Sequence, residues 1–246
     1  MLLSAYMPQK ELITIGEAAR ILQISVDTLR RWDKIGKLNP AQTSPAGYRL
    51  YDRSQIALFL NNLFCSAKDW VLKGDAASSQ FYCSNSAVFQ TKLTQLQDLL
   101  GGVTELHSIF PLLVAIAGEI GNNSFDHNLG NWPDTPGIFF AYDVYKRTIV
   151  LADRGLGVFA TLKRVKPELR TDEEALRVAF TEVLSGRSPE NRGNGLKFVR
   201  KIIARNPMSL LFQTGNAVLT LTQGDDVLDI TTSPEPFRGC LALITF

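Results

Sequence analysis

The sequence predicts an α+β protein in two parts. A small N-terminal domain of short helices with a β-hairpin precedes a larger domain of helices and strands. Three observations predict this fold: two helical patterns and a hairpin pattern at the start, a long apolar helix that leads into two strands, and glycine clusters after those strands. We expect boundaries at residues 1–65, 66–102 and 103–246, with the middle segment as a helical connection.

The composition is that of a folded protein. Of the 246 residues, 45% are apolar and 20% are charged, so the chain can fill a core. No apolar run approaches the ~20 residues that cross a bilayer, and residues 1–12 lack a signal-peptide pattern. We therefore expect a cytoplasmic protein without a membrane span. Three widely spaced cysteines predict buried free thiols rather than disulfides or a zinc site.

Two helix signals begin the N-terminal domain. Thr14, followed by Glu17 three residues later, is a capping box, which predicts a helix that begins there. Ser25 is a second N-cap residue, and the helix that it begins is expected to end at Gly36. Two short helices joined by a tight turn form a helix-turn-helix pattern.

A hairpin and a third helix follow. Residues 43–47 contain proline and glycine and predict a turn that leads into a strand over 48–51. Asp52 is expected to cap a helix over 54–63. Residues 1–65 hold eight basic and five acidic side chains, so their net charge is +3. This excess alone says little about nucleic acid.

This order of elements resembles the MerR and excisionase DNA-binding domains, on residues 15–19, 26–32 and 47–51. The resemblance implies that the second helix enters the major groove of double-stranded operator DNA while the hairpin grips the backbone or minor groove. The side chains implied for contact are Thr28, Arg30, Arg31 and Lys34 of the helix and Arg49 of the hairpin. One alternative stays open, in which the domain docks on a protein and its arginines form a solvated face.

The middle segment contains one readable pattern. Apolar residues recur at helical spacing over 88–100 and end at Gly101. Such a helix could pack on the following domain or pair with its copy in a dimer. A stretch of this length does not distinguish a core from a dimer interface.

Three polar side chains lie at the end of the apolar helix pattern of residues 103–128. Glu119, Asn123 and His127 are spaced four residues apart, so they share one helix face. A carboxylate and a carboxamide are costly inside a protein unless they are bonded to something. The spacing therefore predicts a polar site at this end of the helix.

A second carboxylate follows a pair of strands expected over 137–142 and 147–152. The second strand leads directly into Asp153, Gly155 and Gly157. A carboxylate at a strand end can accept a hydrogen bond from an amino group, and glycine lets the backbone approach a ligand closely. This pattern predicts a binding loop.

Gly193 and Gly195 precede a helix expected over 196–205, whose N-terminus offers free N–H groups to a phosphate. In this order, the helix-face trio, the Asp-x-Gly-x-Gly and the Gly-x-Gly-Leu resemble the N, G1 and G2 boxes of the GHKL ATPases. That family includes gyrase B, the Hsp90 chaperones, histidine kinases, MutL and the anti-sigma-factor kinases. The resemblance spans residues 103–246 and implies an α/β sandwich, a mixed sheet with helices on one face.

The resemblance implies a site for ATP and Mg²⁺. It places the metal on Asn123, the adenine amino group on Asp153, and the general base that activates water on Glu119. Residues 163–191 would form a lid over the nucleotide. The implied nucleotide-binding positions are Asn123, His127, Asp153, Gly155, Gly157, Gly193, Gly195 and Leu196.

Two functions fit this pair of domains. In the first, ATP occupancy switches the affinity for operator DNA, and a homodimer binds an inverted repeat. In the second, an anti-sigma-like or antitoxin-like ATPase or protein kinase binds a partner protein encoded nearby and autoregulates its operon. The sequence leaves open whether ATP is hydrolysed, transferred to a protein or only bound.

Overall fold

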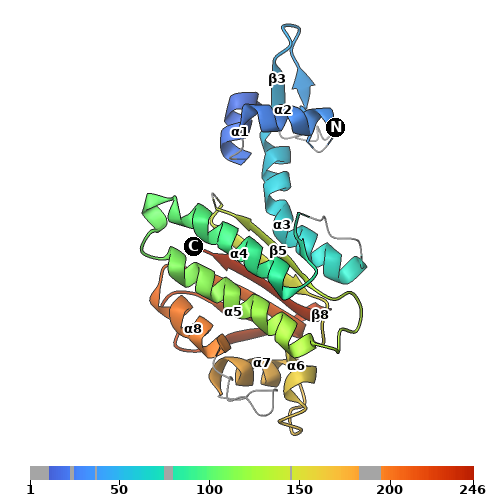
Figure 1. The fold of residues 1–246 in the computed structure, drawn as a ribbon, viewed down its shortest axis with the longest axis vertical. Coiled ribbons are helices and arrows are strands. Elements are labelled where there is room, and N and C mark those ends of the chain that lie inside the picture. Colours follow the sequence, from blue (N-terminus) through green and yellow to red (C-terminus); the bar gives the residue numbers. More distant parts are fainter. Residues whose placement is uncertain (1–10, 23–24, 37, 75–79, 145, 183–194) are drawn as a thin grey trace, which may run out of the picture. The chain divides into compact units, whose positions relative to one another are not determined.

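The computed structural model describes residues 11–22, 25–36, 38–74, 80–144, 146–182 and 195–246 (Figure 1). The chain divides into two compact units, Met1–Asn62 and Leu63–Phe246. Each unit combines an antiparallel sheet with helices, so the predicted α+β class is confirmed. No helix in the described ranges is long and apolar enough to cross a membrane.

The small unit is a three-stranded sheet with short helices, in the strand order β1-β3-β2. Both strand pairings are antiparallel. The sequence patterns did not predict β1, because a strand of three residues shows no periodicity. The elements are β1 (Leu12–Thr14), α1 (Ile15–Leu22), α2 (Val26–Lys34), β2 (Gln42–Thr43), β3 (Arg49–Asp52) and the beginning of α3 (Arg53–Lys73).

Both predicted helix starts are confirmed. Thr14 N donates to Glu17 Oε2 over 2.9 Å, and Glu17 N donates back to Thr14 Oγ1 over 3.2 Å. Ser25 Oγ accepts from Thr28 N over 3.0 Å. The turn between the helices includes residues 23–24, which lie outside the described residues. The helices and sheet enclose a core of Ile13, Ala18, Ala19, Leu29, Leu38, Tyr51 and Ile56.

The hairpin turn is confirmed, and the helix after it is longer than expected. Gly47 N donates to Ser44 O over 2.8 Å, and Gly47 has a φ of 81°, which glycine adopts readily. The helix expected over 54–63 continues as α3 to Lys73. Its residues from Leu63 onward belong to the large unit, where burial of an apolar side sustains the helix.

The large unit is built on a five-stranded sheet with the order β4-β5-β6-β8-β7. We expected a mixed sheet, which is wrong: every described pairing is antiparallel. The reason is that β5 and β6, like β7 and β8, are neighbours in sequence that pair as hairpins. The strands are β4 (Tyr82–Cys83), β5 (Ile138–Asp143), β6 (Thr148–Asp153), β7 (Ser209–Leu221) and β8 (Asp229–Thr245).

Helices α4 and α5 run side by side across one face of this sheet (Figure 1). Four apolar residues of α4 are buried in the shared core: Phe89, Leu93, Leu96 and Leu100. The core-packing interpretation of residues 88–100 is therefore confirmed, and that apolar face is not available to a dimer. The helices are α4 (Ser86–Gly101), η1 (Thr104–Leu106), α5 (Phe110–Asn128), α6 (Gly157–Leu162), α7 (Asp172–Thr181) and α8 (Gly195–Arg205).

The second face of the sheet is also covered, which corrects the expectation of helices on one face only. Alternate residues of β5 point to opposite faces. Ile138 and Phe140 join the core under α4 and α5, whereas Phe139 and Ala141 pack with Trp70 of α3. The C-terminal part of α3 is thus the helix of the opposite layer.

The three cysteines are free thiols. Cys83 is buried and Cys240 is partly buried, but Cys65 is exposed, which corrects the expectation that all three are buried. Cys65 lies on α3, where only one side of the helix packs on the sheet.

Candidate functional site

A pocket lies on the α5 face of the large sheet, where α5 and β6 end. Its cavity volume is about 90 Å³, several times the roughly 10–15 Å³ that one water molecule needs. The end of α5, the end of β6, α6, α7, the start of α8 and strands β7 and β8 supply the lining. The lining residues are Ile120, Asn123, Ser124, His127, Asn128, Asp153, Gly157, Val158, Thr161, Leu162, Ala179, Gly195, Leu196, Phe212 and Cys240.

Asp153 is the buried carboxylate of this pocket. It is 1% exposed and is the last residue of β6. Ser124 Oγ donates to its Oδ2 over 2.7 Å, and Gly155 N donates to its Oδ1 over 2.8 Å. Burial raises the pKa of Asp153, and these hydrogen bonds oppose the rise. Cys240 also hydrogen-bonds to this carboxylate, through its backbone and its side chain, so Asp153 is held by several partners at the pocket wall.

The loop after Asp153 is packed too tightly for side chains at its glycines. A Cβ at Gly155 would lie 2.1 Å from Asn128 Nδ2, and one at Gly157 would lie 2.9 Å from Thr214 Oγ1. Gly157 also has a φ of 76°. Asn128 holds the loop from α5, because its Oδ1 accepts from Leu156 N over 2.8 Å. The loop backbone is thereby fixed against the pocket.

Sequence reasoning missed Ser124 and Asn128. Asn128 Nδ2 donates to Ser124 O over 2.7 Å, so the two residues form a second polar stripe beside the predicted trio. The signal was present, since they are also four residues apart. What the spacing could not show was that this stripe faces Asp153, 29 positions later in the chain.

Glu119 and Asn123 contact each other and the start of α8. Asn123 Nδ2 donates to Glu119 Oε1 over 3.1 Å. A Cβ at Gly195 would lie 1.6 Å from the same oxygen, so the carboxylate lies against the first residue of α8. An anion near a helix N-terminus is stabilised by the helix dipole.

The pocket brings together most of the implied nucleotide positions. Gly155 lies in the loop next to Asp153, and Glu119 lies beside Gly195. Gly193 is outside the described residues. Those that line the pocket are Asn123, His127, Asp153, Gly157, Gly195 and Leu196.

Part of the predicted lid, residues 163–191, is core. Helix α7 buries Leu176 and Phe180 among the side chains under α5 and α8. A segment that opens and closes cannot keep such residues in a close-packed core. The lid expectation is therefore wrong for α7, and residues 183–191 lie outside the described residues.

In the small unit, α2 presents cations on its outer side. Arg31 and Lys34 are exposed, and Arg30 is exposed in an ion pair with Asp27 of 2.9 Å. Thr28 is half-buried, and its Oγ1 is 2.9 Å from Ser25 Oγ at the helix cap. The side chain of Thr28 thus takes part in starting the helix.

Arg49 is not a free cation, in contrast to our expectation that it is available on one face of the hairpin strand. Its Nε donates to Asp33 Oδ2 over 2.6 Å, which ties β3 to α2. This hydrogen bond raises the pKa of Arg49. Contact of Arg49 with DNA would have to share or replace this pair.

Comparison with known proteins agrees with the helix-turn-helix arrangement of the small unit. Residues 14–51 match the model described as MerR family regulatory protein. They form a MerR-family helix-turn-helix domain. The match supports DNA binding and transcription regulation by this domain.

Two curated relatives match short stretches of the chain. The transcriptional regulator BrlR of Pseudomonas aeruginosa is 52% identical over 46 residues, which are 18% of this chain and 17% of that protein. The type II methyltransferase M.Eco47II of Escherichia coli is 38% identical over 61 residues, 25% of this chain and 15% of that protein. The chain thus spans less than a fifth of the length of each of these relatives.

Proposed function

We propose that this protein is a DNA-binding regulator whose large unit binds ATP with Mg²⁺, as in the GHKL ATPases, and that nucleotide occupancy switches DNA binding. The observation that carries the nucleotide proposal is the buried Asp153 carboxylate, held by Ser124 and Gly155 N at the wall of a pocket. A buried carboxylate is stable only with hydrogen-bond partners, and an adenine amino group would be one more donor to it.

The other groups of the pocket fit the remainder of the nucleotide. Glycines at positions 155 and 157 let the loop backbone pack closely against Asn128 and Thr214, which fixes that backbone beside the pocket. Leu196 and Gly195 place the beginning of α8 at the pocket wall, where its free N–H groups would face phosphates. Asn123 would supply an oxygen to Mg²⁺, and His127 lines the same wall. When bound, ATP with its metal would supply a transferable phosphoryl group.

Glu119 is the group that could act on water, because its carboxylate lies beside both Asn123 and Gly195. As a general base it would take a proton from a water molecule near the phosphates. Whether turnover accompanies the switch decides between a regulator that only binds ATP and one that resets itself by hydrolysis.

For the small unit, we propose that α2 enters the major groove of double-stranded DNA. Arg30, Arg31 and Lys34 would contact phosphates or guanine edges. One helix-turn-helix with so few cations binds weakly. Specific recognition would therefore need a homodimer on an inverted repeat. Because α4 is committed to the core, the dimer contact would come from another surface of the large unit.

Calorimetry on the full chain with Mg-ATP tests the nucleotide site. We expect wild type to bind, and Asp153→Asn to lose affinity by about 10- to 150-fold, which corresponds to the ~1.5–3 kcal/mol of one hydrogen bond to a charged group. Asp143→Asn is the matched control, because Asp143 ends the neighbouring strand β5 at the opposite end of the β5–β6 hairpin from Asp153, and its Oδ1 accepts from Lys146 N. Failure of wild type to bind any adenine nucleotide would refute the nucleotide proposal.

Footprinting on the chain's own upstream DNA tests the second half. Protection of two half-sites supports the regulator. Binding of ATP without binding of double-stranded DNA at low salt would favour the alternative, an ATPase or protein kinase that acts on a partner protein.

A further inference from the structure

The loop that holds Asp153 on one face of the large sheet carries Arg154 to the other face. Arg154 is largely buried and forms an ion pair with Asp134. Its guanidinium carbon lies 5.6 Å from the ring centre of Trp70, in a cation–π contact. A Cβ at Gly74, the residue after α3, would lie 3.3 Å from Arg154 Nη2. Arg154 therefore links the loop after Asp153 to the C-terminal end of α3.

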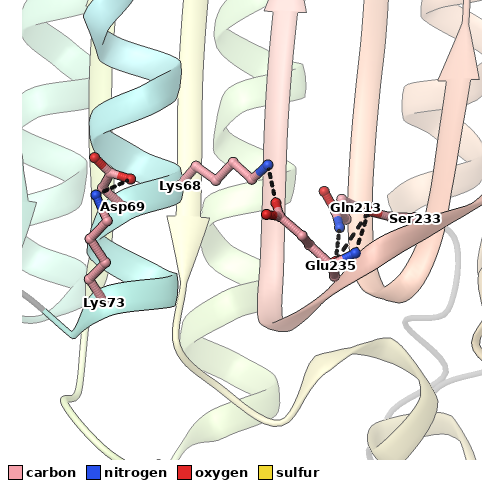
Figure 2. Close-up of polar contacts among 6 residues, drawn as sticks. All are labelled: Lys68, Asp69, Lys73, Gln213, Ser233 and Glu235. Carbon is pink, nitrogen blue, oxygen red and sulfur yellow. Dashed lines mark hydrogen bonds and ion pairs between the residues drawn. The ribbon is translucent and has the colours of Figure 1, made fainter.

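Helix α3 is seated on the sheet at this point. Ala67, Trp70 and Val71 are buried against Phe139 and Leu241. A polar contact fixes the same helix beside this cluster, because Lys68 Nζ lies 2.6 Å from Glu235 Oε2 (Figure 2).

The strand segment that receives Lys68 is itself held in place. Gln213 Nε2 donates to the backbone oxygen of Glu235 over 2.9 Å, and Ser233 Oγ donates to it over 3.2 Å (Figure 2). An apolar cluster and two cations, Lys68 and Arg154, thus fix the position of α3 on the sheet. Only Arg154 belongs to the loop after Asp153.

The same helix begins in the DNA-binding domain. Helix α3 starts at Arg53, directly after strand β3, and runs without a break to Lys73. Packed side chains and continuous helices are the elements that carry coupling between distant sites. A change in how Trp70 packs on the sheet therefore occurs on a helix that begins in the small unit.

The contact of Arg154 has a built-in reason to rearrange. Arg154 Nε is buried and has no hydrogen-bond partner among the described residues. A buried donor without a partner is costly, so the present arrangement carries a penalty that any rearrangement satisfying Nε would relieve. A ligand on Asp153, the residue before Arg154, would shift the loop only as far as it binds one arrangement better than another.

We propose that the contact between Arg154 and Trp70 transmits nucleotide binding to the DNA-binding domain, by changing how the C-terminal part of α3 sits on the sheet. The proposal rests on the proposed function. It predicts reciprocity: Mg-ATP changes the affinity for DNA by some factor, and DNA changes the affinity for Mg-ATP by the same factor.

The test compares the full chain with two variants, Arg154→Gln and Trp70→Leu. Fluorescence anisotropy with a duplex of the chain's upstream region gives the DNA affinity with and without Mg-ATP, and calorimetry gives the ATP affinity. We expect the wild-type DNA affinity to change about 5- to 150-fold with Mg-ATP, a usual range for coupled sites. Both variants should bind Mg-ATP. In both, the ratio of the DNA affinities measured with and without Mg-ATP should fall to one. Lys73→Gln is the matched control, because it removes a cation from the same end of α3, where Lys73 pairs with Asp69 over 3.0 Å (Figure 2).

A ratio that persists in both variants overturns the proposal, as does a wild-type ratio of one in protein that calorimetry shows to bind ATP. Loss of the ratio in Lys73→Gln as well would mean that any disturbance of α3 has this effect, and would also overturn it. If the wild-type protein binds no ATP, the proposed function fails, and the proposed role of the contact between Arg154 and Trp70 fails with it. Where Trp70→Leu lowers folding, seen by circular dichroism, Arg154→Gln alone decides.

Discussion

Glu119 and Asn123 lie one turn apart on α5, and a hydrogen bond of 3.1 Å from Asn123 Nδ2 to Glu119 Oε1 joins them. This bond uses the Nδ2 donor of the Asn123 amide. The Oδ1 of Asn123 is an acceptor that can act as a metal ligand. The two residues implied as general base and metal ligand thus orient each other.

Asn123→Ala should abolish binding of Mg-ATP while the protein stays folded, because it removes the proposed metal ligand and the partner of Glu119. Asn122→Ala is a close control, since Asn122 Oδ1 accepts from Gln90 Nε2 of α4 over 2.8 Å and does not line the pocket. Calorimetry in Mg²⁺ measures both. Equal affinities for the two variants would contradict a role of Asn123 in the site.

Glu119→Ala should keep ATP binding and lose turnover, if the protein hydrolyses ATP. General base catalysis contributes about 10²- to 10⁴-fold, so phosphate release should fall by that factor. Glu105→Ala, on the exposed side of η1, serves as the control. Unchanged release in Glu119→Ala would show that Glu119 is only a polar residue of the helix.

Gly195→Ala should disturb the pocket through Glu119. The new Cβ would lie 1.6 Å from Glu119 Oε1, so the carboxylate would have to leave Asn123. We expect weaker binding of Mg-ATP in the single variant, and little further effect of the alanine in a Glu119→Ala background, because the clash is then gone. Gly102→Ala, where a Cβ makes ordinary contact at 3.5 Å, is the control. Additive effects of the two substitutions would argue against this contact.

Stability should depend on pH through Asp153. Burial raises the pKa of Asp153 in the folded protein, so above the unfolded value of about 3.9 the folded state still holds a proton that the unfolded chain has lost. The free energy of unfolding should therefore fall as pH rises from about 3.9 to the folded-state pKa. Asp153→Asn should flatten this slope, as urea denaturation at several pH values would report. A slope that is the same in wild type and Asp153→Asn excludes this linkage.

Arg30→Ala, Arg31→Ala and Arg49→Ala should each weaken DNA binding and leave ATP binding unchanged. Loss of a base contact should cost about 1–3 kcal/mol and relax specificity at one position, whereas loss of a phosphate contact should weaken all sequences alike and reduce the salt dependence. Arg177→Ala, exposed on α7, controls for charge. Anisotropy across a salt series distinguishes the loss of a base contact from the loss of a phosphate contact. If all three variants bind DNA as wild type does, the small unit is a protein-docking module instead.

Asp33→Asn gives Arg49 a separate test. Because Asp33 Oδ2 accepts from Arg49 Nε over 2.6 Å, its neutralisation should release the cation and remove a negative charge from α2. The DNA affinity at low salt should then rise, the opposite sign to Arg49→Ala.

The sequence by itself determined what depends on neighbours along the chain. The capping box of Thr14 and Glu17, the cap at Ser25, the hairpin turn at Gly47 and the helix over 88–100 follow from side-chain chemistry within a few residues. The polar face with Asn123 was visible for the same reason, because helical periodicity places residues four apart on one side.

Only the tertiary structure decided what depends on distant partners. It turned Ser124 toward Asp153, paired Asp33 with Arg49 and brought Glu119 to the start of α8. It also made the sheet antiparallel, extended α3 across its second face and buried α7. The physical reason is that these features are set by burial and hydrogen bonding between segments far apart in the chain, and local patterns carry no record of which segments meet.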